Sequence, residues 1–166
     1  YQPGKPVEEL QRELGLQRIS KLASNENPLG PSEEVQRVLR DNAAEIACYP
    51  DGNGFSLKQA LAKHHDLEPS CITLGNGSND VLDLVARAYL GQGREAIYSQ
   101  YAFAVYPIAT QSVGARGVMT PAKPVDDPMP YGHDLAAVQA AITPASKVIF
   151  IANPNNPTGT WLEEGA

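Results

Sequence analysis

Two proline-flanked asparagines lie in the segment 147–159, and their side chains could hydrogen-bond a ligand. The β-branched residues at its start, followed by Asn, Pro and Gly, predict a buried strand and an abrupt turn. Because proline disfavours the helical conformation of the preceding residue, we expect Asn153 and Asn156 to be extended. Ligands bind beyond the carboxyl ends of strands in parallel α/β sheets, which is where these amides fall. An ordinary turn of favoured turn residues explains the segment equally well.

A second segment with possible binding chemistry is the glycine-rich loop 75–79, between a strand predicted at 71–74 and a helix predicted at 80–90. The first turn of a helix offers free N–H groups and a dipole that favours a phosphate. The alternative is a tight connection in which Ser78 or Asn79 caps the helix. The loop lacks the spacing of dinucleotide-binding and Walker motifs, so a bound phosphate would belong to a smaller cofactor.

The elements that carry these segments alternate in the manner of a wound α/β layer. From residue 71 onward, the hydrophobic patterns predict strand, helix, strand, helix, strand, loop, helix and strand. The first part of the chain has further helical patterns, one of them capped by Ser32. The predicted helices cover 6–15, 32–44, 56–67, 80–90, 103–112 and 134–142, and the strands cover 71–74, 95–98, 115–119 and the start of 147–159.

Composition excludes several classes of protein. A net charge of −6 without basic runs argues against a nucleic-acid-binding surface. No apolar stretch approaches the ~20 residues that span a bilayer, so no membrane association is expected. The two cysteines, Cys48 and Cys71, have neither disulfide-framework nor zinc-site spacing, which favours a reducing, cytoplasmic location. The expected partners are small molecules or protein.

Four motifs together resemble the front half of histidinol-phosphate aminotransferases, which are fold-type I enzymes that use pyridoxal 5'-phosphate. The resemblance runs through nearly the whole chain, and its motifs are, in order, Ser-Asn-Glu-Asn-Pro-Leu-Gly-Pro-Ser at 24–32, Tyr-Pro-Asp at 49–51, Gly-Ser-Asn-Asp at 77–80 and Asn-Pro-Asn-Asn-Pro-Thr-Gly at 153–159. It implies an N-terminal arm and small-domain segment at 1–48. It also implies the incomplete first half of a large, three-layer α/β domain that binds the cofactor, at 49–166.

The resemblance assigns cofactor contacts to several residues. Asn156 would donate its amide hydrogen to the phenolic oxygen of the cofactor ring. Gly77, Ser78 and Asn79 match the family's phosphate-binding helix start, in agreement with the anion site inferred above. Tyr101 corresponds to the aromatic residue that stacks on the cofactor ring.

Three further positions matter for the resemblance. Tyr49 matches a tyrosine whose hydroxyl reaches the cofactor phosphate of the partner subunit, which implies a homodimer. Asn27 lies in a segment that covers the substrate. The chain departs from the family at Asp80, where close relatives often carry Glu.

The resemblance also implies what the chain lacks. No lysine of the chain matches the family's Schiff-base motif, so we expect this catalytic lysine beyond Ala166 and no catalytic residue before it. The implied activity converts histidinol phosphate and 2-oxoglutarate to imidazole-acetol phosphate and glutamate, in histidine biosynthesis. The alternatives are a related enzyme, such as a threonine-phosphate decarboxylase or an aromatic aminotransferase, and an inert module that binds a phosphorylated ligand.

Overall fold

The computed structural model describes residues 4–165, and the chain forms two compact units, Tyr1–Gln59 and Ala60–Ala166. The domain boundary expected between residues 48 and 49 stays a prediction. No helix in the described range 4–165 is long and apolar enough to cross a membrane.

The first unit consists of short helices joined by extended segments. α1 (Val7–Leu14) ends as predicted at Gly15, whose φ of 64° suits glycine. α2 (Glu33–Asp41) begins as predicted after Ser32, whose side chain accepts a hydrogen bond from the Val35 N–H. α2 ends earlier than predicted and is followed by a 3₁₀ helix, η1 (Ala43–Ala47), because Asn42 donates its side-chain amide to the Val38 carbonyl at 2.9 Å. The start of α3 (Phe55–His65) completes the unit.

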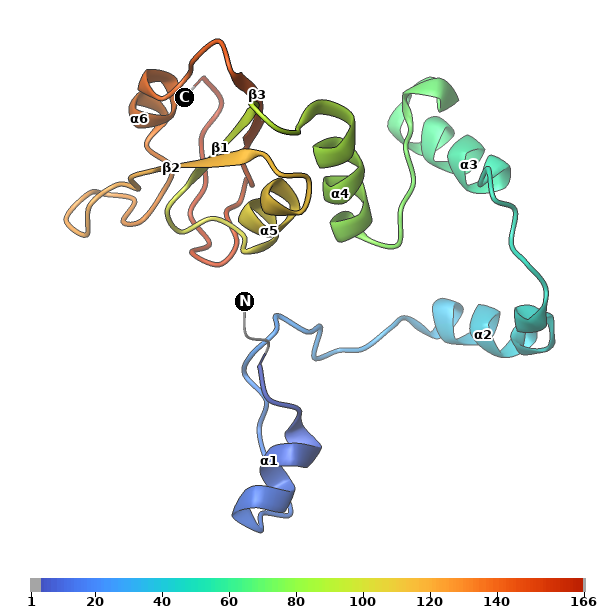
Figure 1. Ribbon diagram of the computed structural model, residues 1–166. Coiled ribbons are helices and arrows are strands. Elements are labelled where there is room, and N and C mark those ends of the chain that lie inside the picture. The colour runs from blue at the N-terminus through green and yellow to red at the C-terminus, as the bar shows by residue number, and fades with distance from the viewer. Residues whose placement is uncertain (1–3, 166) are drawn as a thin grey trace. The chain divides into compact units, whose positions relative to one another are not determined.

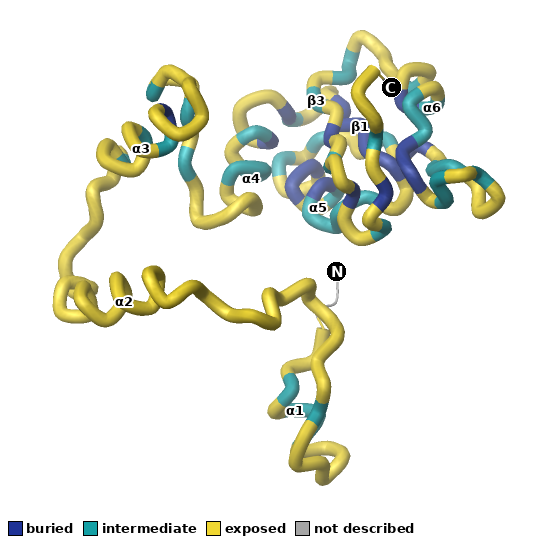
Figure 2. The backbone as a smooth tube through the Cα atoms, turned by 180° about the vertical axis from the view of Figure 1, so that it is seen from behind, coloured by how far each residue is buried: buried dark blue, intermediate teal, exposed yellow. Residues whose placement is uncertain are grey.

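The described residues of the first unit include no buried one, and Figure 2 shows this part of the chain almost entirely in the exposed colour. Large apolar side chains stand in solvent there, among them Leu22, Leu29, Leu39, Ile46 and Tyr49. Residues 4–59 therefore have no hydrophobic core of their own.

The second unit is a three-layer α/β arrangement, as predicted (Figure 1). Its parallel sheet has the order β2-β1-β3, formed by β1 (Glu95–Ser99), β2 (Arg116–Thr120) and β3 (Ser146–Phe150). The helices are the end of α3, α4 (Ser78–Tyr89), α5 (Val105–Ser112) and α6 (Leu135–Ala140). α6 forms where a helix was predicted to open at Asp134, and Asp134 caps it by accepting from the Ala137 N–H at 3.0 Å.

The core lies where α4 and α5 cover one face of the sheet. Ala86 of α4 and Ala109 of α5 pack with Ala96 and Tyr98 of β1 in one buried cluster. Side chains alternate along a strand, so Ile97 faces the opposite side, where α6 contacts β1. All five residues of β1 are buried because it lies between two strands and two helical layers.

Two strand predictions are wrong. Residues 72–74 form no strand, because no described strand lies beside them, and Cys71 belongs to a 3₁₀ helix, η2 (Pro69–Cys71). β3 is not fully buried: its exposure alternates, since it pairs with β1 on one side and forms an edge of the described sheet on the other.

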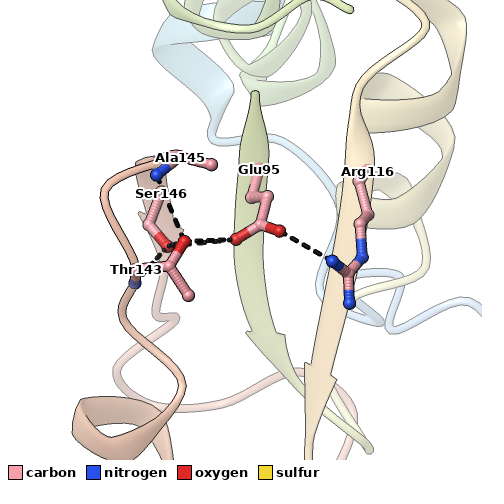
Figure 3. Close-up of polar contacts among 5 residues, drawn as sticks. All are labelled: Glu95, Arg116, Thr143, Ala145 and Ser146. Carbon is pink, nitrogen blue, oxygen red and sulfur yellow. Dashed lines mark hydrogen bonds and ion pairs between the residues drawn. The ribbon is translucent and has the colours of Figure 1, made fainter. Parts of the chain in front are cut away.

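The amino ends of the three strands meet at Glu95, a carboxylate that is only 7% exposed (Figure 3). Its oxygens accept from the Arg116 guanidinium at 2.9 Å and from the Thr143 hydroxyl at 2.8 Å. A buried charge needs such partners, and here they come from β2 and from the turn before β3. This network lies at the edge of the sheet opposite to the predicted ligand segments.

Candidate cofactor site

The loops that follow β1 and β3 are joined at the carboxyl edge of the sheet. Tyr101 lies just after β1, and its backbone carbonyl accepts a hydrogen bond from the side-chain amide of Asn155 at 3.0 Å. The two residues are 54 positions apart in the chain. The parallel order of the strands thus brings together two of the segments that the sequence singled out.

The turn after β3 contains three asparagines with different surroundings. Asn153 exchanges two hydrogen bonds with the backbone of Leu162, at 3.1 and 2.9 Å. Asn155 is buried and bonds within the protein. Asn156 is exposed, and its carboxamide makes no hydrogen bond to any residue in 4–165. Of the two amides first expected to be available for a ligand, only that of Asn156 makes no hydrogen bond within the described part of the chain. Both X-Pro bonds of the turn, Asn153-Pro154 and Asn156-Pro157, are cis.

Tyr101 presents part of its ring to solvent, being 40% exposed. The ring meets Tyr131 edge to face, with 5.2 Å between centroids and an interplanar angle of 82°. This contact orients the ring, and the exposed part of the residue leaves surface for a planar ligand.

His133 also joins the carboxyl ends of β1 and β3, a role that was not predicted from the sequence. It is 3% exposed, and its Nδ1 lies 2.7 Å from the Ser99 hydroxyl. Its Nε2 lies 3.0 Å from the Ala152 carbonyl, which can only accept, so Nε2 carries the proton and donates. His133 therefore connects the ends of β1 and β3. The only local feature of the sequence that could have drawn attention to His133 is its position directly before Asp134, which caps α6.

The helix start expected to bind a phosphate is open in the structure. α4 begins at Ser78, two residues before the predicted start, with Gly77 as its N-cap at φ 78° and no capping side chain. The alternative in which Ser78 or Asn79 caps the helix is therefore wrong. The N–H groups of the first turn precede the first intrahelical hydrogen bond and have no capping side chain.

Two neighbours shape this helix start. The Asp80 carboxylate accepts from the backbone N–H of Asn76 at 2.9 Å and from its side chain at 3.1 Å. A Cβ at Gly75 would lie 2.7 Å from the Asp80 Cβ, so only glycine fits there. The helix dipole favours an anion, and the charge of Asp80 opposes it.

Tyr49 and Asn27 belong to the first unit, whereas the other predicted site residues belong to the second. The Tyr49 side chain is fully exposed. Asn27 closes its own turn, donating to the Gly30 carbonyl and accepting from the Leu29 N–H, both at 3.0 Å. The roles of both residues stay predictions.

A cavity of about 750 Å³ lies between α1 and residues 19–26, within the first unit. None of the seven predicted site residues lines it. It has two lysines, Lys5 and Lys21, but both are paired with glutamates. We therefore place the candidate site at the loops after β1 and β3 and at the start of α4.

Comparison with known proteins identifies the family of the chain. A family profile described as aminotransferase class I and II matches residues 17–165. Histidinol-phosphate aminotransferase 2 of Methylococcus capsulatus is 59% identical over 165 residues, which are 99% of this chain and 44% of that protein. The protein of the same name from Pseudomonas aeruginosa is 57% identical over 164 residues, 98% of this chain and 43% of its own. The chain thus spans less than half of the length of these relatives.

A solved structure gives the same result for the fold. The crystal structure of histidinol-phosphate aminotransferase from Sinorhizobium meliloti in complex with pyridoxal-5'-phosphate matches with a TM-score of 0.83 and 27% identity. The match covers 97% of this chain and 42% of that one. It confirms the predicted fold-type I aminotransferase architecture. Since the family profile covers most of the sequence, the chain belongs to the class I and II aminotransferase family.

Proposed function

We propose that the protein containing this chain is a pyridoxal-phosphate-dependent histidinol-phosphate aminotransferase, and that the chain supplies part of its cofactor site. The observation that carries the proposal is the free carboxamide of Asn156. Its two neighbouring asparagines use their side chains within the protein, whereas Asn156 keeps an exposed donor at the carboxyl edge of the sheet. An unused amide and the partly exposed ring of Tyr101, in loops that Asn155 links, suit a planar polar cofactor.

The described residues fit pyridoxal phosphate. The open start of α4, at Gly77, Ser78 and Asn79, would hold its phosphate with backbone N–H groups. Asn156 would donate to the phenolic oxygen, and the Tyr101 ring would stack on the pyridine ring. The bound cofactor supplies an electron sink for the charge left when a substrate proton is removed. The chain's own residues bind and orient this group.

The proton transfers need a base, and we propose that it is a lysine outside this chain. The lysines near the sheet are engaged locally: Lys147 donates to the Pro144 carbonyl at 2.9 Å, and Lys123 pairs with Asp127 at 3.6 Å. Neither has the free amine that a nucleophile and general base requires.

The substrate and the assembly are part of the same proposal. The relatives named histidinol-phosphate aminotransferase are 57–59% identical to nearly the whole chain, which supports histidinol phosphate and 2-oxoglutarate as substrates. We further propose a homodimer in which Tyr49 reaches the cofactor phosphate of the partner subunit. The fully exposed Tyr49 side chain supports this role. Asn27 would lie over the substrate.

Steady-state assays of the full-length protein test the proposal. With 2-oxoglutarate as acceptor, we expect histidinol phosphate to give a higher kcat/KM than phenylalanine by at least about 100-fold, because the site must recognise a phosphate. Activity with phenylalanine alone would favour an aromatic aminotransferase. Release of carbon dioxide from threonine phosphate would favour a decarboxylase, and no turnover with bound ligand would favour an inert binding module.

A further inference from the structure

We propose that Asn155 is a positioning residue that holds Tyr101 and Asn156 in the relative positions that the cofactor needs. The inference rests on the proposed function, since it concerns how the two cofactor contacts are held. Asn155 itself would not touch the cofactor, because its side chain is only 4% exposed and its amide group bonds within the protein.

The side chain of Asn155 spans the two loops. Its Nδ2 donates to the Tyr101 carbonyl at 3.0 Å and to the Thr158 hydroxyl at 2.8 Å. The first bond reaches the loop after β1, and the second stays within the turn after β3. The two hydrogens of one amide group thus set the position of Tyr101 relative to the turn.

The backbone of Asn155 is fixed as well. Its N–H donates to the Thr160 carbonyl at 2.7 Å, and its carbonyl accepts from the Gly159 N–H at 2.8 Å. The turn is therefore closed on both sides of the residue that precedes Asn156. A displacement of Asn155 must move the free carboxamide of Asn156 with it.

The other polar atom of the side chain argues against a purely stabilising role. The Oδ1 of Asn155 is buried and has no hydrogen-bond partner within residues 4–165. A buried polar atom without a partner costs stability, so an apolar side chain would avoid this cost. What asparagine provides here is the donor that points to Tyr101.

The contact extends a link that already exists at the strand ends. His133 joins Ser99 at the end of β1 to Ala152 just after β3. Asn155 continues this connection into the loops, where the cofactor contacts lie. Tyr101 is then held twice, through its carbonyl by Asn155 and through its ring by Tyr131.

The first test uses the full-length protein without cofactor. Asn155→Ala removes the link to Tyr101, and Asn153→Ala is the matched control, because it removes two hydrogen bonds of the same turn that go to Leu162 instead. By hydrogen exchange, we expect the Ala102 amide, which donates to Ser99, to exchange at least about tenfold faster in Asn155→Ala only. The Leu162 amide should respond to Asn153→Ala. Unchanged exchange at Ala102 in Asn155→Ala would overturn the proposal.

The second test measures cofactor binding. We expect the dissociation constant of pyridoxal phosphate to rise about tenfold in Asn155→Ala, the effect of roughly one hydrogen bond, and to change less than about threefold in Asn153→Ala. If Asn155 acts in part through the Tyr101 ring, its substitution in a Tyr101→Ala background should raise the dissociation constant by clearly less than it does in the unmodified protein. Effects that simply multiply would overturn the inference.

Two controls separate the possible failures. If Asn155→Ala does not fold, Asn155→Leu fills the same space without a donor and must give the same results. If the unmodified protein binds no pyridoxal phosphate, the proposed function fails, while the exchange measurement on the cofactor-free protein still decides whether Asn155 holds Tyr101.

Discussion

At the level of single residues, the three asparagines in the turn after β3 have three different roles. Asn153 ties the turn to Leu162, Asn155 ties it to Tyr101, and Asn156 keeps its carboxamide free. The residue type is the same in each case, and the difference comes from burial and from the available partners. A side chain without a partner is the one whose loss should not harm the fold.

We predict that Asn156→Ala leaves thermal unfolding of the cofactor-free, full-length protein unchanged within about 1 °C, because no described hydrogen bond is lost. Asn153→Ala, which removes two, should lower the midpoint by several degrees. Affinity for pyridoxal phosphate should show the opposite order, with a loss of about tenfold or more in Asn156→Ala. Equal losses of thermal stability in both variants would contradict this assignment.

The stabilisation that the Asp51 carboxylate gives to the start of α3 should depend on pH, with a sign that follows from its hydrogen bonds. Its carboxylate accepts from the Phe55 N–H at 2.7 Å and the Asn53 N–H at 2.9 Å, and these bonds lower the pKa of Asp51. The stabilisation of the start of α3 is then present above the unfolded pKa, about 3.9, and is lost as pH falls through the lower folded value. A carboxyl titration followed by NMR in the full-length protein should give a midpoint below about 3.9. A midpoint at or above it would show that these two hydrogen bonds do not form.

At the scale of elements, β1 organises the second unit. It pairs with both other strands, and its side chains meet helices on both faces. Glu95 fixes its amino end, and Ser99 with His133 fixes its carboxyl end. The site loops leave from the fixed carboxyl end, which is why residues distant in sequence can share one binding site.

Gly117 of β2 should not tolerate a side chain. A Cβ there would lie 2.1 Å from the Tyr98 hydroxyl oxygen. We expect Gly117→Ala to lower the free energy of unfolding by about 1–3 kcal/mol, as overpacking does. Gly52→Ala, where no atom lies within 4 Å of the added Cβ, is the control in denaturant titrations. Tyr98→Phe in the Gly117→Ala background should recover part of the loss, and its failure to do so would place the cause elsewhere.

Elements defined by local signals could be predicted from the sequence. Ser32 caps the helix it was expected to cap, a helix forms directly after Asp134 as expected, and the α/β alternation predicted the fold class. Features that depend on residues distant in the sequence could not be predicted. Residues 72–74 have strand character but no neighbouring strand, and the contact of Asn155 with Tyr101 spans 54 positions. Asn156 was identified from the motif, but that its amide is free follows only from the structure.

At the scale of the whole molecule, the two units differ in what holds them together. The described core lies in the second unit, around β1, α4 and α5. The described part of the first unit has exposed apolar side chains and no buried residue. Such a segment gains too little from burial to offset the entropy of ordering its chain.

We therefore predict that a peptide of residues 1–59 shows no cooperative thermal unfolding by circular dichroism, because it lacks a core. A peptide of residues 60–166 should retain more ordered structure under the same conditions, since it contains the buried cluster. A sharp, concentration-independent transition in the 1–59 peptide would contradict the assignment of stability to the second unit.

The proposed cofactor site is tested most directly by a crystal structure of the full-length protein with pyridoxal phosphate. We predict the Asn156 amide nitrogen within about 3 Å of the phenolic oxygen, the phosphate at the N–H groups of Ser78 and Asn79, and the Tyr101 ring against the pyridine ring. A cofactor bound elsewhere, with Asn156 still free in solvent, would contradict this prediction.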